Sequence, residues 1–137
     1  MANVTSTQLI LDGPRNTVVK VEGVLDTSDL ASFVIADPAT LAGLDSTGLQ
    51  KAAKLSLLKV TYSIEDALEV RIAWDATAPA RLIELTGRGK ADFRDIGGLT
   101  NNAGAGVNGK VLLSTEGWSV SKILSFTVIL HFKKQQF

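Results

Sequence analysis

The sequence predicts an all-β protein, an antiparallel β-sandwich of the jelly-roll type with about eight strands. Apolar and polar residues alternate with a period of two over several segments, which is typical of half-buried strands. Clusters of turn-forming residues separate these segments, and no long apolar stripe has helical spacing. We therefore expect a single domain over residues 1–137, with a short N-terminal arm and a long Gly-rich loop that projects around 87–109.

The clearest alternation covers residues 58–64, and residues 68–74 repeat it. The link between them, Glu65-Asp66, is short enough for a tight hairpin, although it lacks the glycine that a primed turn favours. We expect these two strands to pair antiparallel. Residues 81–86 would follow as the third strand of a meander.

Five further segments have strand character. A long strand is expected at 125–133, and residues 8–11 and 17–25 form a pair around a cluster of turn formers. Residues 29–36 could begin as a capped helical turn, but their β-branched and aromatic residues favour a strand. A short strand at 110–114 precedes another turn.

Composition excludes several function classes. Fourteen Lys and Arg residues balance fourteen Asp and Glu residues, which disfavours nucleic acid as a partner because phosphate binding usually needs a basic excess. The absence of cysteine removes disulfides, thiol nucleophiles and cysteine-ligated metals. The apolar run Leu9–Leu11 is too short for a membrane span, so we expect no membrane partner. The apolar fraction of 45% with 20% charge favours contact with another subunit.

Motifs that resemble catalytic or cofactor sites have plainer explanations. The run from Gly104 to Lys110 matches phosphate-loop patterns in letters, but a strand-like segment follows it where a helix is needed. His131 is the single histidine, and its parity places it on the more polar face of the last strand. The carboxylate pairs lie in turns, where acids are normally solvated. We therefore expect no enzyme, no cofactor and no metal site.

Aromatic residues and a basic cluster provide candidate contact residues. Trp74 and Tyr62 have core parity, whereas Trp118 follows a glycine and could be exposed. Aromatic side chains on projecting segments are typical anchors of subunit interfaces. Our hypothetical interaction surface has its densest part in the long loop and comprises Arg88, Lys90, Phe93, Arg94, Trp118 and Phe137.

Four segments carry a resemblance to a known class of proteins: MANVTSTQLILDG, TYSIEDALEVRIAWDATA, LTGRGKADFRDIGGLTNNAGAGVNGKVLLSTEGW and ILSFTVILHFKK. The chain resembles the small, cysteine-free β-proteins of tailed bacteriophage virions, above all the capsid cement or decoration proteins. The resemblance implies a sandwich that is made in the host cytoplasm and associates with itself as a dimer or trimer. It would then bind the outer capsid surface and clamp neighbouring major capsid protein subunits.

Two other functions stay open at this point. A head-completion, neck or tail protein of the same virion would have a similar composition but would form rings of fixed copy number. A carbohydrate-binding module is the alternative from another class, with Trp118 and neighbouring loops as a stacking surface.

Overall fold

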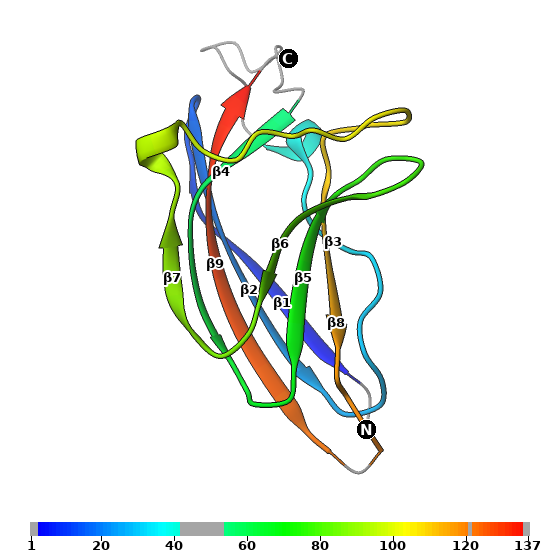
Figure 1. The fold of residues 1–137 in the computed structure, drawn as a ribbon. Coiled ribbons are helices and arrows are strands. Elements are labelled where there is room, and N and C mark those ends of the chain that lie inside the picture. The colour runs from blue at the N-terminus through cyan, green and yellow to red at the C-terminus, as the bar shows by residue number, and fades with distance from the viewer. Residues whose placement is uncertain (1–2, 42–53, 121, 136–137) are drawn as a thin grey trace.

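The computed structural model describes residues 3–41, 54–120 and 122–135, and it is built almost wholly of strands (Figure 1). Two short 3-10 helices, η1 (Pro38–Thr40) and η2 (Arg94–Ile96), interrupt the strands. The strands are β1 (Val4–Asp12), β2 (Asn16–Leu25), β3 (Phe33–Ala36), β4 (Lys54–Ile64), β5 (Glu69–Trp74), β6 (Ala80–Leu85), β7 (Arg88–Asp92), β8 (Val111–Glu116) and β9 (Leu124–Gln135). No helix in the described part of the chain is long and apolar enough to cross a membrane.

The strands form two antiparallel sheets that pack as a sandwich. The five-stranded sheet has the order β1-β2-β9-β4-β7, and the four-stranded sheet has the order β3-β8-β5-β6. From β2 onward the chain repeatedly crosses between the sheets, and only β5 and β6 follow one another within a sheet. This connectivity is that of a jelly roll, so the predicted fold class is confirmed.

The predicted hairpin between residues 58–64 and 68–74 is wrong. These segments are β4 and β5, and they lie in different sheets, where β4 pairs with β7 and β9 while β5 pairs with β6 and β8. The link between them turns at Ala67, which has φ +74°, and the Leu68 amide donates to the Glu65 carbonyl over 3.2 Å. Each strand has one apolar face, and crossing to the opposite sheet makes these faces oppose one another across the core.

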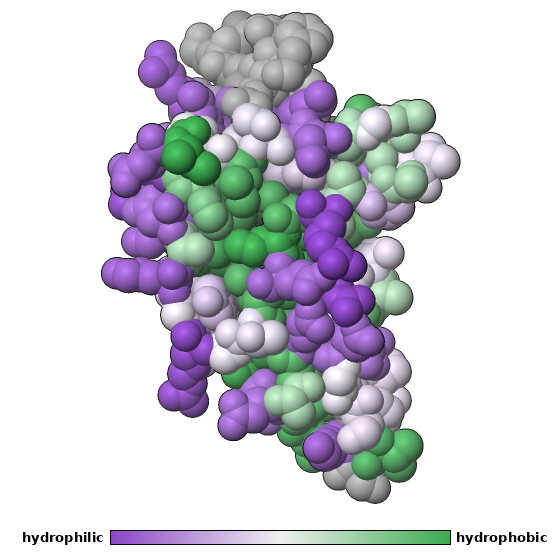
Figure 2. All heavy atoms as spheres, in the orientation of Figure 1, coloured by the Kyte–Doolittle hydropathy of each residue, from purple (hydrophilic) through white to green (hydrophobic). Residues whose placement is uncertain are grey.

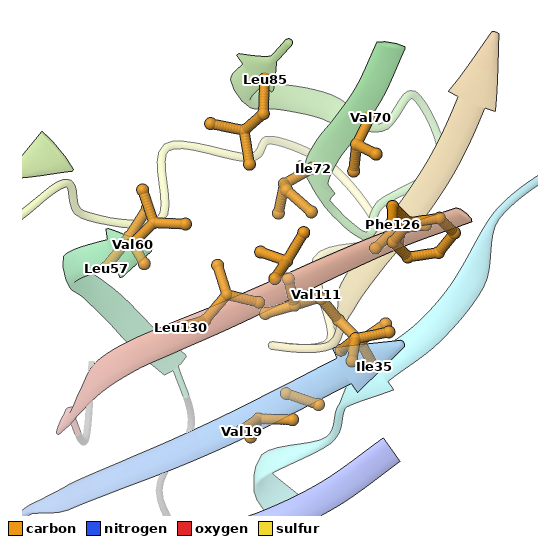
Figure 3. Packing of buried hydrophobic residues seen from close by; sticks show 14 of the residues in the cluster. Val19, Ile35, Leu57, Val60, Val70, Ile72, Leu85, Val111, Phe126 and Leu130 are labelled. Atoms are coloured by element: carbon orange, nitrogen blue, oxygen red, sulfur yellow. The ribbon is translucent and has the colours of Figure 1, made fainter. Parts of the chain in front are cut away.

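The core lies between the sheets and is made of aliphatic side chains with a few aromatic rings (Figure 3). Inward-facing Val19, Val60, Phe126 and Leu130 come from the five-stranded sheet, and Ile72 from the four-stranded sheet faces them. Trp74 is 1% exposed, as its parity predicts, while Tyr62 is half-buried against the same core. At about 25 cal/mol per Å² of apolar surface, this burial is the main favourable term in folding.

The region expected to be a projecting loop at 87–109 is only partly a loop. Its first residues form β7, an edge strand whose inward side consists of Gly89 and Ala91. The glycine-rich part reaches the β5–β6 loop, where the Thr77 amide donates to the Ala105 carbonyl over 3.0 Å. Gly106 adopts φ +81° beside Thr77, and an added Cβ would lie 2.2 Å from the threonine hydroxyl. The close approach therefore requires glycine here.

A buried ion pair links β9 to the turn between β1 and β2. The Lys134 side chain is fully buried, and its Nζ lies 2.6 Å from Asp12 Oδ1 and 2.6 Å from the Gly13 carbonyl oxygen. The Lys134 amide also donates to the Arg15 carbonyl over 2.7 Å. The turn between β1 and β2 is thus attached to β9 through backbone and side chain alike.

Candidate functional site

One row of outward-facing residues crosses the whole five-stranded sheet. Strand register places Leu11 beside Val18, Val18 beside His131, His131 beside Lys59, and Lys59 beside Asp92. Side chains at paired positions stand on the same face about 5 Å apart. Five segments that are distant in the sequence are therefore neighbours on one surface.

Two irregularities in the pairing flank this row. The register of β1 with β2 shifts between Leu9 and Leu11, and the register of β4 with β9 shifts between Leu57 and Lys59. The Thr17 hydroxyl donates to the Leu11 carbonyl over 3.0 Å, which holds the first bulge. Bulges bend a strand and redirect its side chains, and they are common beside binding sites.

A hollow of about 340 Å³ lies between the two bulges, on the outer face of the five-stranded sheet. Its apolar part is contributed by Leu11, Val18 and Leu58. Polar side chains that can donate or accept hydrogen bonds lie beside them, namely Asn16, Lys59, Arg94 and His131. The buried residues Thr17 and Phe132 complete the lining. We call this site, with these nine residues, the outer-face hollow.

A hydrogen-bonded pair positions the cation at one side of the hollow. Arg94 Nε lies 2.9 Å from Asp92 Oδ1, and the Arg94 amide donates to the same oxygen over 3.0 Å. Both bonds favour the ionised carboxylate, so they lower the pKa of Asp92 far below its usual range. The same pairing raises the pKa of Arg94. The guanidinium is therefore held in one place beside Lys59 and His131.

His131 is the titratable group at the centre of the row. Partial burial lowers the pKa of His131, and the positive charges of Lys59 and Arg94 lower it further. The carboxylate of Asp92 acts in the opposite direction but more weakly. The imidazole is therefore neutral at pH 7, with one nitrogen to donate and one to accept a hydrogen bond.

The structure brings together three of the residues proposed from the sequence. Arg88 and Lys90 face outward on β7, and Arg94 lies at the border of the outer-face hollow. Phe93 is half-buried and packs against the core. It therefore offers little of its ring to a partner.

The other two proposed residues are not part of this group. Trp118 packs against the core between β8 and β9, where its Nε1 donates to the Lys122 carbonyl over 3.0 Å and its amide to Asp29 over 3.1 Å. The half-buried indole is thus committed to its own segment and is not a free stacking platform. Phe137 lies outside the described residues.

Sequence reasoning missed most of the outer-face hollow. Leu11, Val18 and Leu58 are ordinary strand residues in the sequence, and Asn16 is read as a turn former. The local signals were the cation density around Arg94 and the parity of His131, which lies on the polar side of its strand. The others converge through long-range register, which local patterns do not contain.

A second hollow, of about 370 Å³, opens at the other edge of the sandwich between β1 and β3. It is lined mainly by apolar residues, including Leu9, Val34 and Leu41. The chain continues from Leu41 into residues 42–53, which are not described, so we assign no site there. Within residues 3–41, 54–120 and 122–135, no group of three or more His, Asp or Glu side chains is placed to hold a metal ion.

Comparisons with known proteins give no sequence relative from which a function could be inferred. No protein-family model matches the chain, and no curated protein sequence matches it. One solved structure that matches is described as "CBM4 structure and function". The match covers 97% of this chain and 95% of that one, with 10% sequence identity and a TM-score of 0.33. At that distance the likeness does not indicate a ligand, which has to be inferred from this chain's own surface.

The comparison nevertheless corrects the function expected from the sequence. The assignment as a capsid cement or decoration protein is corrected, because none of these comparisons finds a virion protein and the matched structure is described as a carbohydrate-binding module. The neck or tail alternative gains no support either. A bacteriophage origin and self-association as a dimer or trimer are not addressed by these matches and stay predictions.

Proposed function

We propose that this chain is a non-catalytic carbohydrate-binding domain, and that the outer-face hollow is its binding site. The observation that carries the proposal is the composition of the hollow, which joins apolar side chains to an amide, an imidazole, an ammonium and a guanidinium group. Sugar rings have the same mixed character, with C–H surfaces and many hydroxyl groups. Apolar contact and a few placed hydrogen bonds together provide affinity and orientation.

The position of the hollow also suits a chain-like ligand. It lies on the open outer face of the five-stranded sheet, not inside the sandwich, so a polymer could pass across it without an end having to enter. The row of residues through the hollow spans all five strands, or roughly 19 Å at the usual strand spacing. Several sugar units could therefore contact the sheet at once, and their weak contacts would add.

Binding to soluble polysaccharides, neutral and acidic, tests the proposal by affinity electrophoresis and titration calorimetry. Leu11→Ser removes apolar surface from the hollow, and we expect it to weaken binding by about threefold to tenfold. Val34→Ser is the matched control, because Leu11 and Val34 are 52% and 43% exposed but Val34 lies on β3 of the other sheet. Equal losses in both variants, or no polysaccharide bound by the wild-type protein, would contradict the proposal.

A further inference from the structure

Positive charge is concentrated on the outer face of the five-stranded sheet. Besides Lys54, which faces outward at the start of β4, six cationic side chains lie there or at its border, against two carboxylates on the strands, Glu22 and Asp92. The cations are Lys20, Lys59, Arg88, Lys90, Arg94 and Lys133. Asp95, next to Arg94 in η2, and Glu65, which accepts a hydrogen bond from Ser125 Oγ just after β4, add two more carboxylates at the border. The whole chain has a formal net charge of zero, so this excess is a property of one face.

In the described part of the chain, only two of these six cations have an acidic partner on this face. Lys20 Nζ lies 2.8 Å from Glu22 Oε1, and Arg94 is bonded to Asp92. Among the described residues, no ion pair within 4.0 Å involves the other four, which are Lys59, Lys90, Arg88 and Lys133. Figure 2 shows the hydrophilic side chains that project along the β7 rim of the molecule.

The four unpaired cations form a diagonal stripe. Lys133 and His131 are successive outward positions on β9, and Lys59 pairs with His131 on the next strand. Lys90 and Arg88 follow on β7, paired with Thr61 and Ser63 of β4. With strands about 4.8 Å apart and a rise of about 6.8 Å per two residues, each step of the stripe is roughly 7–8 Å. A linear ligand with charges at regular intervals would match this arrangement.

We propose that the ligand is an acidic polysaccharide, whose carboxylate or sulfate groups contact Lys59, Lys90 and the neighbouring cations of the stripe. This inference rests on the proposed function and specifies its ligand class. Opposite charges across an interface set specificity and rate of encounter, and like charges reject the wrong partner. Lys59 and Lys90 have no ion pair among the described residues, so binding at these two side chains breaks none.

The test compares four probes with one pair of variants. The probes are polygalacturonate, heparin, neutral dextran and single-stranded DNA, each titrated at low and at physiological salt. Lys59→Gln/Lys90→Gln removes two charges from the stripe, and Lys110→Gln/Lys122→Gln removes two charges from loops flanking β8, in the other sheet. Both variants should keep the wild-type melting temperature within a few degrees, because none of these lysines has an ion pair among the described residues.

We expect polygalacturonate or heparin to bind more tightly than dextran, and more weakly as salt increases. The Lys59/Lys90 variant should lose about tenfold in affinity, against less than twofold for the control. Tightest binding of polygalacturonate would indicate that the ligand carries carboxylates, and tightest binding of heparin would indicate that it carries sulfates.

Three outcomes would overturn the inference. Equal, salt-insensitive binding of dextran would remove the acidic ligand but leave carbohydrate binding intact. Equal losses in the two double variants would show that the stripe is not the contact surface. Binding of DNA with no binding of any polysaccharide would overturn both this inference and the proposed function.

Discussion

The charged residues on the two outer faces of the sandwich differ in their ion pairing. On the four-stranded sheet, Arg71 pairs with Glu69, Glu84 and Glu116, and Arg81 pairs with Glu84. The carboxylates there are thus shared between neighbouring strands of one sheet. On the five-stranded sheet, the four cations of the stripe have no such partner among the described residues. Arg71 and Arg81 on the four-stranded sheet are thus paired with neighbouring carboxylates, whereas the cations of the stripe can interact with solvent or a ligand.

This difference does not come from the backbone or the core. Both sheets are antiparallel, and both bury one side of each central strand against the same aliphatic core. Only the outward positions differ, and these contribute little to folding when the charges are exposed. The comparison therefore indicates which face is free to be specialised for binding. Substitutions on its two sides should distinguish the interactions that stabilise the five-stranded sheet from the charges on its outer face.

The largest expected effect comes from the one buried cation of the five-stranded sheet. Lys134→Ala should lower the free energy of unfolding by about 3 kcal/mol, because it removes a buried ion pair and leaves a cavity. Urea denaturation measures the loss. Lys133→Ala is the control, since this exposed neighbour should change stability by less than about 0.5 kcal/mol. Similar losses for both would show that the Asp12 pair does not anchor β9.

The inner side of the same sheet gives a second, smaller effect. A Cβ at Gly23 would lie 2.5 Å from the Phe126 ring, so Gly23→Val should cost about 2 kcal/mol through overpacking. Gly13→Ala serves as the control, because its nearest neighbour would be 3.7 Å away. Thermal and urea unfolding measure both variants. Wild-type stability in Gly23→Val would mean that the Phe126 ring moves aside without cost.

The outer side should respond to pH instead. Because the pKa of His131 lies below its ordinary 6.5 in the folded chain, protonation favours the unfolded state, and stability falls as pH drops below that value. A bound polyanion acts oppositely, because it stabilises the charged imidazole beside Lys59 and Arg94. Heparin affinity should therefore rise about threefold or more between pH 7.5 and pH 5.5, in a range where its sulfates stay ionised.

His131→Gln provides the control for this pH dependence. The variant keeps a hydrogen-bonding side chain but cannot titrate, so most of the rise should disappear. Titration calorimetry at the two pH values would measure it. An unchanged rise in the variant would assign the effect to groups other than His131.

The smallest effect should come from the four-stranded sheet. Arg71→Gln leaves three carboxylates near one another, and the melting temperature should fall by about 2 °C at low salt and less at high salt. Affinity for heparin should not change, because the residue lies on the opposite face. A loss of heparin binding in this variant would contradict the assignment of the two faces.

The strands that sequence reasoning predicted well are those with strong alternation. β2, β5 and β9 each carry an apolar side that the core requires, and their residues reveal it directly. β7 was missed because Gly89 and Ala91 form its inward side and give no apolar signal. Periodicity also says which side of a strand is buried but not which strand lies beside it. The pairing of β4 with β5 was therefore open to error.

The candidate site, like the fold, could be predicted from the sequence only in part. The density of cations at Arg88, Lys90 and Arg94 is visible in the sequence, as is the polar parity of His131. Their meeting with Leu11 and Val18 depends on two bulges and on the position of β9 between β2 and β4. These are long-range relations that a single sequence does not display. The sequence neighbours of Trp118 predict exposure, but its indole packs against the core through residues distant in the sequence.

The place of β9 in the five-stranded sheet has a consequence for the order of events during synthesis. β9 is the last strand of the sheet in chain order, yet it pairs with both β2 and β4 in the middle of the sheet. A ribosome must therefore release nearly all of the sheet's residues before β2 gains its second neighbour. Until β9 is synthesised, no strand joins β2 to β4, so their apolar sides do not form one continuous face. Folding should accordingly be slow and late, and the unfinished chain is the form most exposed to aggregation.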